Sequence, residues 1–142
     1  MKNKILTIFM LFILIVNKSS ATENPKNDYQ EVIEAYRDSF LNTDYKKLKK
    51  VLDPNAVFGY SRAEKIIKHD AWTFLDNMYK NRGMVQQDCE AKAAVIAASS
   101  SQVIAQIDVN YLQFDNRQKH VITIEKDDDG KWKITNVFKY FF

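Results

Sequence analysis

The sequence predicts an α+β domain, with helices in its first half and a curved antiparallel sheet in its second half. Three observations support this class. Apolar residues recur with helical spacing in residues 28–42, apolar and polar residues alternate with a period of two between residues 89 and 140, and turn-forming residues separate the alternating runs. We expect a single domain over residues 28–142, preceded by segments that are not part of the fold.

The alternating runs define the strands and the face that each strand buries. Runs at 89–97, 103–111 and 132–140 alternate clearly, whereas the run at 117–126 is less regular because Val121 interrupts it. The side chains expected on the inner face are Cys89, Ala91, Ala93, Val95, Ala97, Val103, Ala105, Ile107, Val109, Tyr111, His120, Ile122, Ile124, Trp132, Ile134, Asn136, Phe138 and Tyr140.

Turn chemistry sets the expected pairing of the first three of these strands. The Asp-Asn pair at 115–116 suits a two-residue hairpin loop, because both residue types tolerate positive φ. That loop would place Tyr111 opposite His120. Three serines at 99–101 would close the preceding hairpin and place Cys89 opposite Tyr111.

A glycine-containing loop sets the expected pairing of the last two strands. The Asp-Asp-Gly sequence at 128–130 would place Ile124 beside Ile134 and His120 beside Phe138. Every apolar face then lies on one side of the sheet, and a one-residue slip in any hairpin would spoil this arrangement.

The first half predicts three helices and one short strand. Residues 28–42 form an amphipathic helix, residues 44–52 a second short helix that ends before Pro54, and residues 56–60 a strand. Ser61 and Glu64 have capping-box spacing, which predicts a third helix over 61–81 that stops at Gly83.

The first 21 residues resemble an export signal. Lys2 and Lys4 precede an apolar stretch at 5–16, and small residues at 19–21 suit signal cleavage near Ala21. The stretch is shorter than the ~20 residues that a membrane-spanning helix needs. We therefore expect an exported protein, periplasmic or secreted, with a polar lead-in at 22–27 and no stable membrane insertion after cleavage; an uncleaved anchor is the alternative.

Charge argues against a nucleic-acid partner. Without the predicted signal the chain loses three lysines and no acidic residue, which leaves 18 basic and 18 acidic residues. A nucleic-acid-binding surface requires clustered positive charge. The two histidines have no cysteine or carboxylate grouping beside them, so we also expect no metal site and no cofactor.

The order of elements resembles the cystatin-like cone of the nuclear transport factor 2-like superfamily. The likeness covers residues 28–142, and its best local pieces are the Tyr-Arg-Asp-Ser-Phe run at 36–40 and the strand at 130–138. This chain resembles the SnoaL-like, ketosteroid-isomerase-like and putative lumazine-binding members. The resemblance implies a bent sheet around the helices, a conical pocket, and a homodimer through the outer sheet face.

The same resemblance raises the question of whether this sequence contains the catalytic residues of ketosteroid-isomerase-like members. Ketosteroid-isomerase-like members use an acidic base together with a tyrosine and a second acid. Tyr36 loosely matches the tyrosine, but the acidic residues of the sheet are expected to point outward: Asp88, Glu90, Asp108 and Glu125. The carboxyl pair needed for this chemistry is therefore missing.

A small polar group is expected inside the cone instead. Tyr111, His120 and Asn136 would gather on the inner face, where they either orient a ligand or satisfy one another as a buried trio. The residues expected to bind a ligand are Tyr36, Phe40, Phe58, Tyr60, Tyr111, His120 and Asn136.

Three functions remain open at this point. The first is a binding module for a small apolar or planar molecule in the cone. The second is an isomerase, dehydratase or cyclase with His120 as its catalytic base. The third is an exported immunity or accessory protein that binds another protein through the outer sheet face.

Overall fold

The computed structural model describes residues 28–142, so the predicted export signal and lead-in lie outside the described residues. Its elements, in chain order, are α1 (Asp28–Asn42), α2 (Tyr45–Val51), β1 (Leu52–Arg62), β2 (Lys65–Asp70), α3 (Ala71–Lys80), β3 (Cys89–Ala98), β4 (Gln102–Tyr111), β5 (Asn116–Lys126) and β6 (Trp132–Phe141). None of these helices is long and apolar enough to cross a bilayer.

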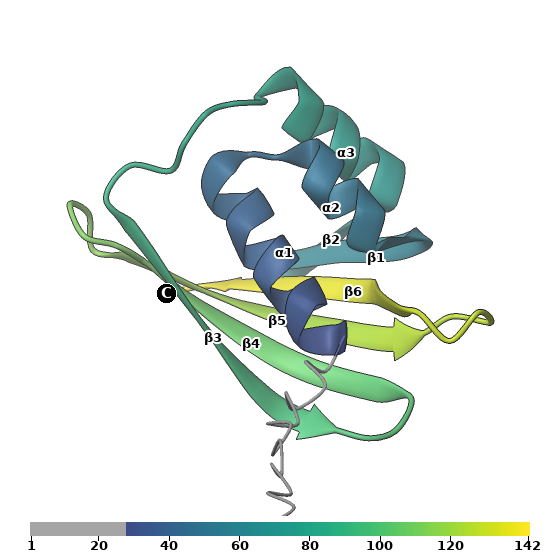
Figure 1. Cartoon of the computed structure of the whole chain (residues 1–142). Helices are drawn as coiled ribbons and strands as arrows, with labels where there is room; N and C mark the ends of the chain where they lie inside the picture. Colours follow the sequence, from purple (N-terminus) through teal and green to yellow (C-terminus); the bar gives the residue numbers. More distant parts are fainter. Residues whose placement is uncertain (1–27) are drawn as a thin grey trace, which may run out of the picture.

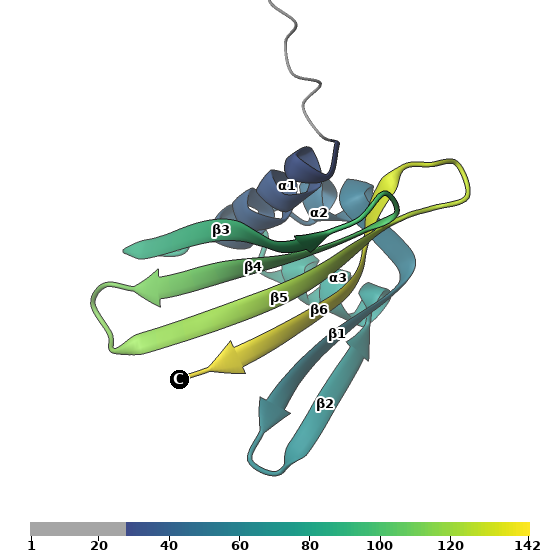
Figure 2. The ribbon, with the colours of Figure 1, turned by 90° about the horizontal axis from the view of Figure 1, so that it is seen from below.

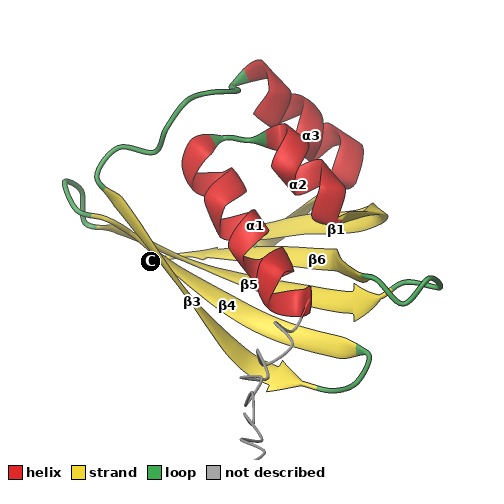
Figure 3. Cartoon of the chain, in the orientation of Figure 1, coloured by secondary structure: helices red, strands yellow, loops and turns green. Residues whose placement is uncertain are grey.

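The strands form one six-stranded sheet, and the helices lie against one of its faces (Figures 1 and 3). The strand order is β2-β1-β6-β5-β4-β3. Seen from below, the strands twist progressively, and β1 and β2 turn away from the rest (Figure 2). All neighbours are antiparallel except β1 and β6, which pair in parallel. The predicted curved sheet is thus present, and the β1–β2 hairpin extends it beyond the four long strands.

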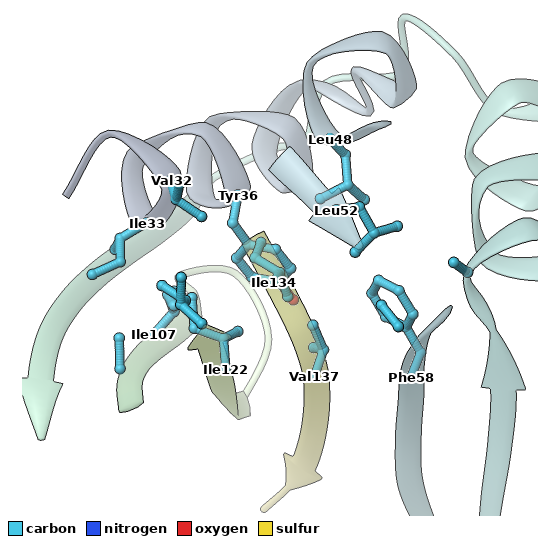
Figure 4. Packing of buried hydrophobic residues seen from close by; sticks show 14 of the residues in the cluster. Val32, Ile33, Tyr36, Leu48, Leu52, Phe58, Ile107, Ile122, Ile134 and Val137 are labelled. Atoms are coloured by element: carbon cyan, nitrogen blue, oxygen red, sulfur yellow. The ribbon is translucent and has the colours of Figure 1, made fainter. Parts of the chain in front are cut away.

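The core forms where α1 crosses the sheet. Figure 4 shows Val32, Ile33 and Tyr36 pointing from α1 toward the strands. The sheet residues of this core are buried, and burial of each valine or isoleucine side chain stabilises the fold by about 1.5–3 kcal/mol. They are Val103, Ala105, Ile107, Val109, Ile122, Ile124, Ile134 and Val137.

The pairing of β4 with β5 differs from the prediction by four residues. A four-residue loop, rather than the two-residue loop at 115–116, connects the strands, so Tyr111 lies opposite Asn116 and His120 lies opposite Ile107. The predicted Tyr111–His120 pair was therefore wrong. The predicted faces were right nonetheless, because a shift by an even number of residues leaves each side chain on the same side of the sheet.

A β-bulge in β6 has a larger effect. Ile124 pairs with Ile134 as predicted, but Thr123 pairs with Asn136, so β6 carries one extra residue at Thr135. Beyond the bulge the alternation is inverted: Val137 is buried inside, and Asn136 is exposed. The predicted inner positions of Asn136, Phe138 and Tyr140 were wrong for this reason.

The third helix begins ten residues later than predicted. Residues 61 and 62 end β1, and residues 63 and 64 form the turn of the β1–β2 hairpin, with Ala63 at a φ of 52°, so the capping-box spacing does not mark a helix here. The helix begins after Asp70, whose carboxylate accepts a hydrogen bond of 2.7 Å from the backbone N–H of Thr73. The predicted helices at 28–42 and 44–52, by contrast, correspond to α1 and α2.

The outer face of the sheet is closely packed at one glycine. Phe138 lies opposite Gly59 in the parallel β1–β6 pair, and a Cβ at Gly59 would lie 2.9 Å from Cδ2 of Phe138. The aromatic ring therefore covers the space that a side chain at Gly59 would fill.

We predict that Gly59→Ala lowers the free energy of unfolding by about 1–3 kcal/mol, because the new methyl group collides with the Phe138 ring. Urea unfolding monitored by circular dichroism measures this change. Adding Phe138→Leu should recover part of the loss. A double variant that shows the simple sum of the two single effects would contradict this account of the contact.

Candidate functional site

A pocket of about 510 Å³ lies between the helices and the β1–β6 part of the sheet. Its walls come from α1, α2, α3, β1, β2, β6 and the segment that follows α3. The lining residues are Tyr36, Phe40, Thr43, Leu48, Phe58, Gly59, Tyr60, His69, Phe74, Asn77, Met78, Asn81, Met84, Gln86, Lys139 and Phe141.

Aromatic rings form much of the wall. Phe58 from β1 and Phe74 from α3 stack in parallel, with ring centroids 3.8 Å apart. Tyr60 stacks on the imidazole of His69 at 6.0 Å, and the Phe141 ring meets Tyr60 edge-on. Flat apolar surfaces of this kind favour ligands that are themselves planar.

Lys139 is the charged group of the pocket. Because of the bulge at Thr135, this residue faces the helices, and its ammonium nitrogen lies 5.4 Å from the centre of the Phe40 ring and 5.1 Å from that of Phe74. Both distances fall within the range of a cation–π interaction. Burial lowers the pKa of Lys139 to about 8, so most molecules carry the charge at neutral pH.

Within residues 28–142, no carboxylate balances this charge. The lining residues from this part of the chain include neither Asp nor Glu. Among residues 28–142, the ion pairs that the structure contains involve other lysines and arginines. The pocket therefore presents a positive charge within mainly aromatic and amide surroundings.

His120 lies behind the pocket wall rather than in the pocket. It is fully buried, its Nδ1 lies 2.9 Å from the Tyr36 hydroxyl, and its Nε2 lies 3.1 Å from Oε1 of Gln118. Since Gln118 Oε1 can only accept, the proton belongs on Nε2, and Nδ1 accepts from the tyrosine. Burial, and secondarily the charge of Lys139, lowers the pKa of His120 to about 3. Burial also raises the pKa of Tyr36.

This geometry is that of a satisfied buried network. Both imidazole nitrogens are occupied, and the ring edge packs against Phe40 at 4.9 Å between centroids. A neutral histidine of such low pKa is also a weak base. The arrangement supports the structural alternative for His120 that the sequence left open.

The predicted ligand-binding residues fall into two groups. Tyr36, Phe40, Phe58 and Tyr60 line the pocket, whereas Tyr111, His120 and Asn136 do not.

Each of the three that do not line it has a separate location. Tyr111 pairs with Cys89, as predicted, and donates a hydrogen bond of 2.9 Å to Oε1 of Gln86. Asn136 is exposed on the outer sheet face, and His120 is enclosed beneath α1. The expected polar trio is therefore not assembled.

Sequence reasoning missed Lys139 and His69. Nothing in the local sequence of β6 marks the bulge, and period-two alternation alone predicts that Lys139 faces outward. His69 was assigned to a helix, although the neighbouring Ile66 and Ile67 favour a strand. Within the part of the chain that the structure describes, no three histidine, cysteine or acidic side chains come together as metal ligands would.

We predict that stability falls as the pH drops from about 6.5 to about 3, because His120 stays neutral in the folded state and takes up a proton on unfolding. The comparison is with His120→Gln, which cannot take up this proton. Urea unfolding at several pH values measures the difference, and a pH-independent difference would contradict the burial of a neutral imidazole.

We predict that Lys139→Met raises the free energy of unfolding by about 1 kcal/mol at pH 7, because the folded state no longer buries an ammonium group. Wild-type stability should rise between pH 8 and 10.5 as the folded state is relieved of this charge, and the variant should lack that rise. Thermal unfolding of both proteins across this range provides the measurement; a less stable variant at pH 7 would refute the prediction.

Comparisons with known proteins identify the fold of this chain. No family model and no curated protein matches the sequence. Solved structures do match: an NTF2-like protein of unknown function from Shewanella baltica aligns with a TM-score of 0.67 and 15% identity, covering 81% of this chain and 91% of that one. A comparable protein from Methylobacillus flagellatus gives a TM-score of 0.66 and 14% identity over 81% and 90% of the two chains.

A third similar structure, from Parabacteroides distasonis, is described as a "putative ketosteroid isomerase". It aligns with a TM-score of 0.61 and 14% identity, covering 86% of this chain and 92% of that one. Identities this low are informative about architecture. This chain has the α+β fold of nuclear transport factor 2-like proteins, as its sequence predicted.

Proposed function

We propose that this chain is a binding module that holds a small apolar or planar molecule in the pocket beneath α1 and α3. The observation that carries the proposal is the pocket itself: about 510 Å³, with stacked aromatic rings and aliphatic side chains in its wall and hydroxyl, amide, imidazole and ammonium groups beside them. Ligand sites typically occupy roughly 300–1,000 Å³ and combine apolar walls with a small number of polar anchors. The volume lies within this range, and the aromatic and aliphatic side chains supply the apolar part of the wall.

The enzyme alternative has less support. Two similar structures are described as a "putative ketosteroid isomerase", but within residues 28–142 no carboxylate lines the pocket to serve as base. His120, the base expected from sequence, has both nitrogens engaged and no exposed surface. A substrate would therefore need the buried Tyr36–His120 contact to open before proton transfer, which binding alone does not require.

Two further expectations belong to this proposal. Export rests on the signal-like character of residues 1–21. For a homodimer through the outer sheet face, the support is two apolar side chains at the β3–β4 edge that are more than half exposed: Ile96 in β3 at 57%, and Leu112 in the turn that follows β4 at 59%. The same surface would serve the accessory-protein alternative, in which another protein replaces the second copy.

We predict that N-phenyl-1-naphthylamine, a neutral dye that fluoresces in apolar sites, binds the wild-type protein, and that Asn77→Trp weakens binding at least tenfold. The indole would occupy the pocket, which Asn77 lines from the exposed side of α3. Fluorescence titration provides the measurement. A chain starting at residue 22 contains every described helix and strand.

Thr73→Trp is the matched control, since Thr73 is exposed on the same helix and does not line the pocket. Its affinity for the dye should equal that of the wild type. Equal dye binding by Asn77→Trp and Thr73→Trp, or no binding by the wild type, would reject the pocket as the binding site.

A further inference from the structure

The ammonium group of Lys139 lies in the pocket without a carboxylate from the described residues beside it. Lys139 reaches the pocket from β6, and among the residues that the structure describes its ammonium group has ring faces as neighbours but no carboxylate. No side-chain nitrogen or oxygen in the described residues is buried without a hydrogen-bond partner. Since Lys139 has no hydrogen bond to a described group, its ammonium is open to the pocket space rather than sealed in the core.

This arrangement favours negative ligands over positive ones. Aromatic walls attract cations, but Lys139 already occupies the neighbourhood of the Phe40 and Phe74 rings and would repel a second positive charge. A buried ammonium is unfavourable when unpaired, and a ligand that brings one negative charge would relieve that cost. A ligand with several negative charges would bury further charges that have no positive partner in the pocket, which disfavours it.

One of the polar groups that line the pocket, the Gln86 amide, is consistent with an acceptor on the ligand. Gln86 lines the pocket, and its side-chain oxygen already accepts a hydrogen bond of 2.9 Å from the Tyr111 hydroxyl. The amide nitrogen of Gln86, which can only donate, is the part of this side chain left without a described partner. Lys139 and Gln86 thus contribute donors to the pocket.

We propose that the pocket selects planar, mainly apolar molecules that carry a single negative charge, such as an aromatic carboxylate or sulfonate, and that Lys139 is their counter-ion. This inference rests on the proposed function, because it requires the pocket to be a ligand site.

The effect of pH depends on all groups that face Lys139. Titratable groups around it are Tyr36 from α1, Tyr60 from β1, His69 from β2 and His120 from β5. His120 stays neutral near pH 7. A His69→Gln variant separates any charge on that imidazole from the charge on Lys139.

The experiment compares two dyes that differ by one sulfonate. N-phenyl-1-naphthylamine is neutral, and 8-anilino-1-naphthalenesulfonate adds one permanent negative charge to the same ring system. We expect Lys139→Met to weaken binding of the sulfonate about tenfold or more, since hydrogen bonds to charged groups are worth that much. Binding of the neutral dye should change less than threefold, and Lys139→Arg should retain the sulfonate.

Lys92→Met is the control for net charge. Lys92 is exposed on β3, with 83% of its side chain accessible, and it lies outside the pocket lining. Its removal should leave both affinities unchanged. If Lys139→Met does not fold, the wild type still tests the inference. Its affinity for the sulfonate should decline as the pH rises from 7 to 9, whereas its affinity for the neutral dye should not. The His69→Gln variant should show the same two results.

The possible results are distinguishable. If the wild type binds neither dye, the proposed function and this inference both fail. If the neutral dye binds but the sulfonate binds wild type and Lys139→Met equally, the pocket is a ligand site and only the counter-ion role of Lys139 is overturned. Equal losses in Lys92→Met and Lys139→Met would also overturn it, because they would reflect surface charge alone.

Discussion

The β-bulge at Thr135 is the constraint on which the candidate site depends. A strand of period two presents every second side chain to the same face, and one inserted residue exchanges the two faces for the remainder of the strand. Before the bulge, β6 contributes Ile134 to the core; after it, the strand contributes Val137 and then Lys139. Without the extra residue, the lysine would face solvent and Phe138 would occupy the pocket wall.

The network around His120 explains why the pocket ends where it does. Tyr36 extends from α1 to the imidazole, and the resulting hydrogen bond ties the helix to the centre of the sheet. Beyond this point the space between helix and sheet is filled by aliphatic side chains. The Tyr36–His120 hydrogen bond therefore lies at the boundary between the solid core and the pocket, whose wall includes the stacked rings of Phe58 and Phe74.

Much of the architecture could be predicted because it depends on patterns of burial. The inner faces of β4 and β5 were correct despite the four-residue error in pairing, since alternation survives an even shift. The candidate site was harder to predict, because it depends on places where the chain departs from regular strand alternation and from the expected helix. Neither the bulge that turns Lys139 inward nor the hairpin that brings His69 to the wall has a unique local signature, and tertiary packing decides both.

The parallel pairing of β1 with β6 has a consequence for the order of assembly. It joins segments about eighty residues apart in the chain, and the pocket wall is shared between them. Closing so long a loop is entropically costly, so we expect the hollow to be completed after the local hairpins have formed. Because β6 lies between β1 and β5, it cannot leave the sheet without breaking both pairings, so a molecule that occupies the hollow stabilises the domain as a whole.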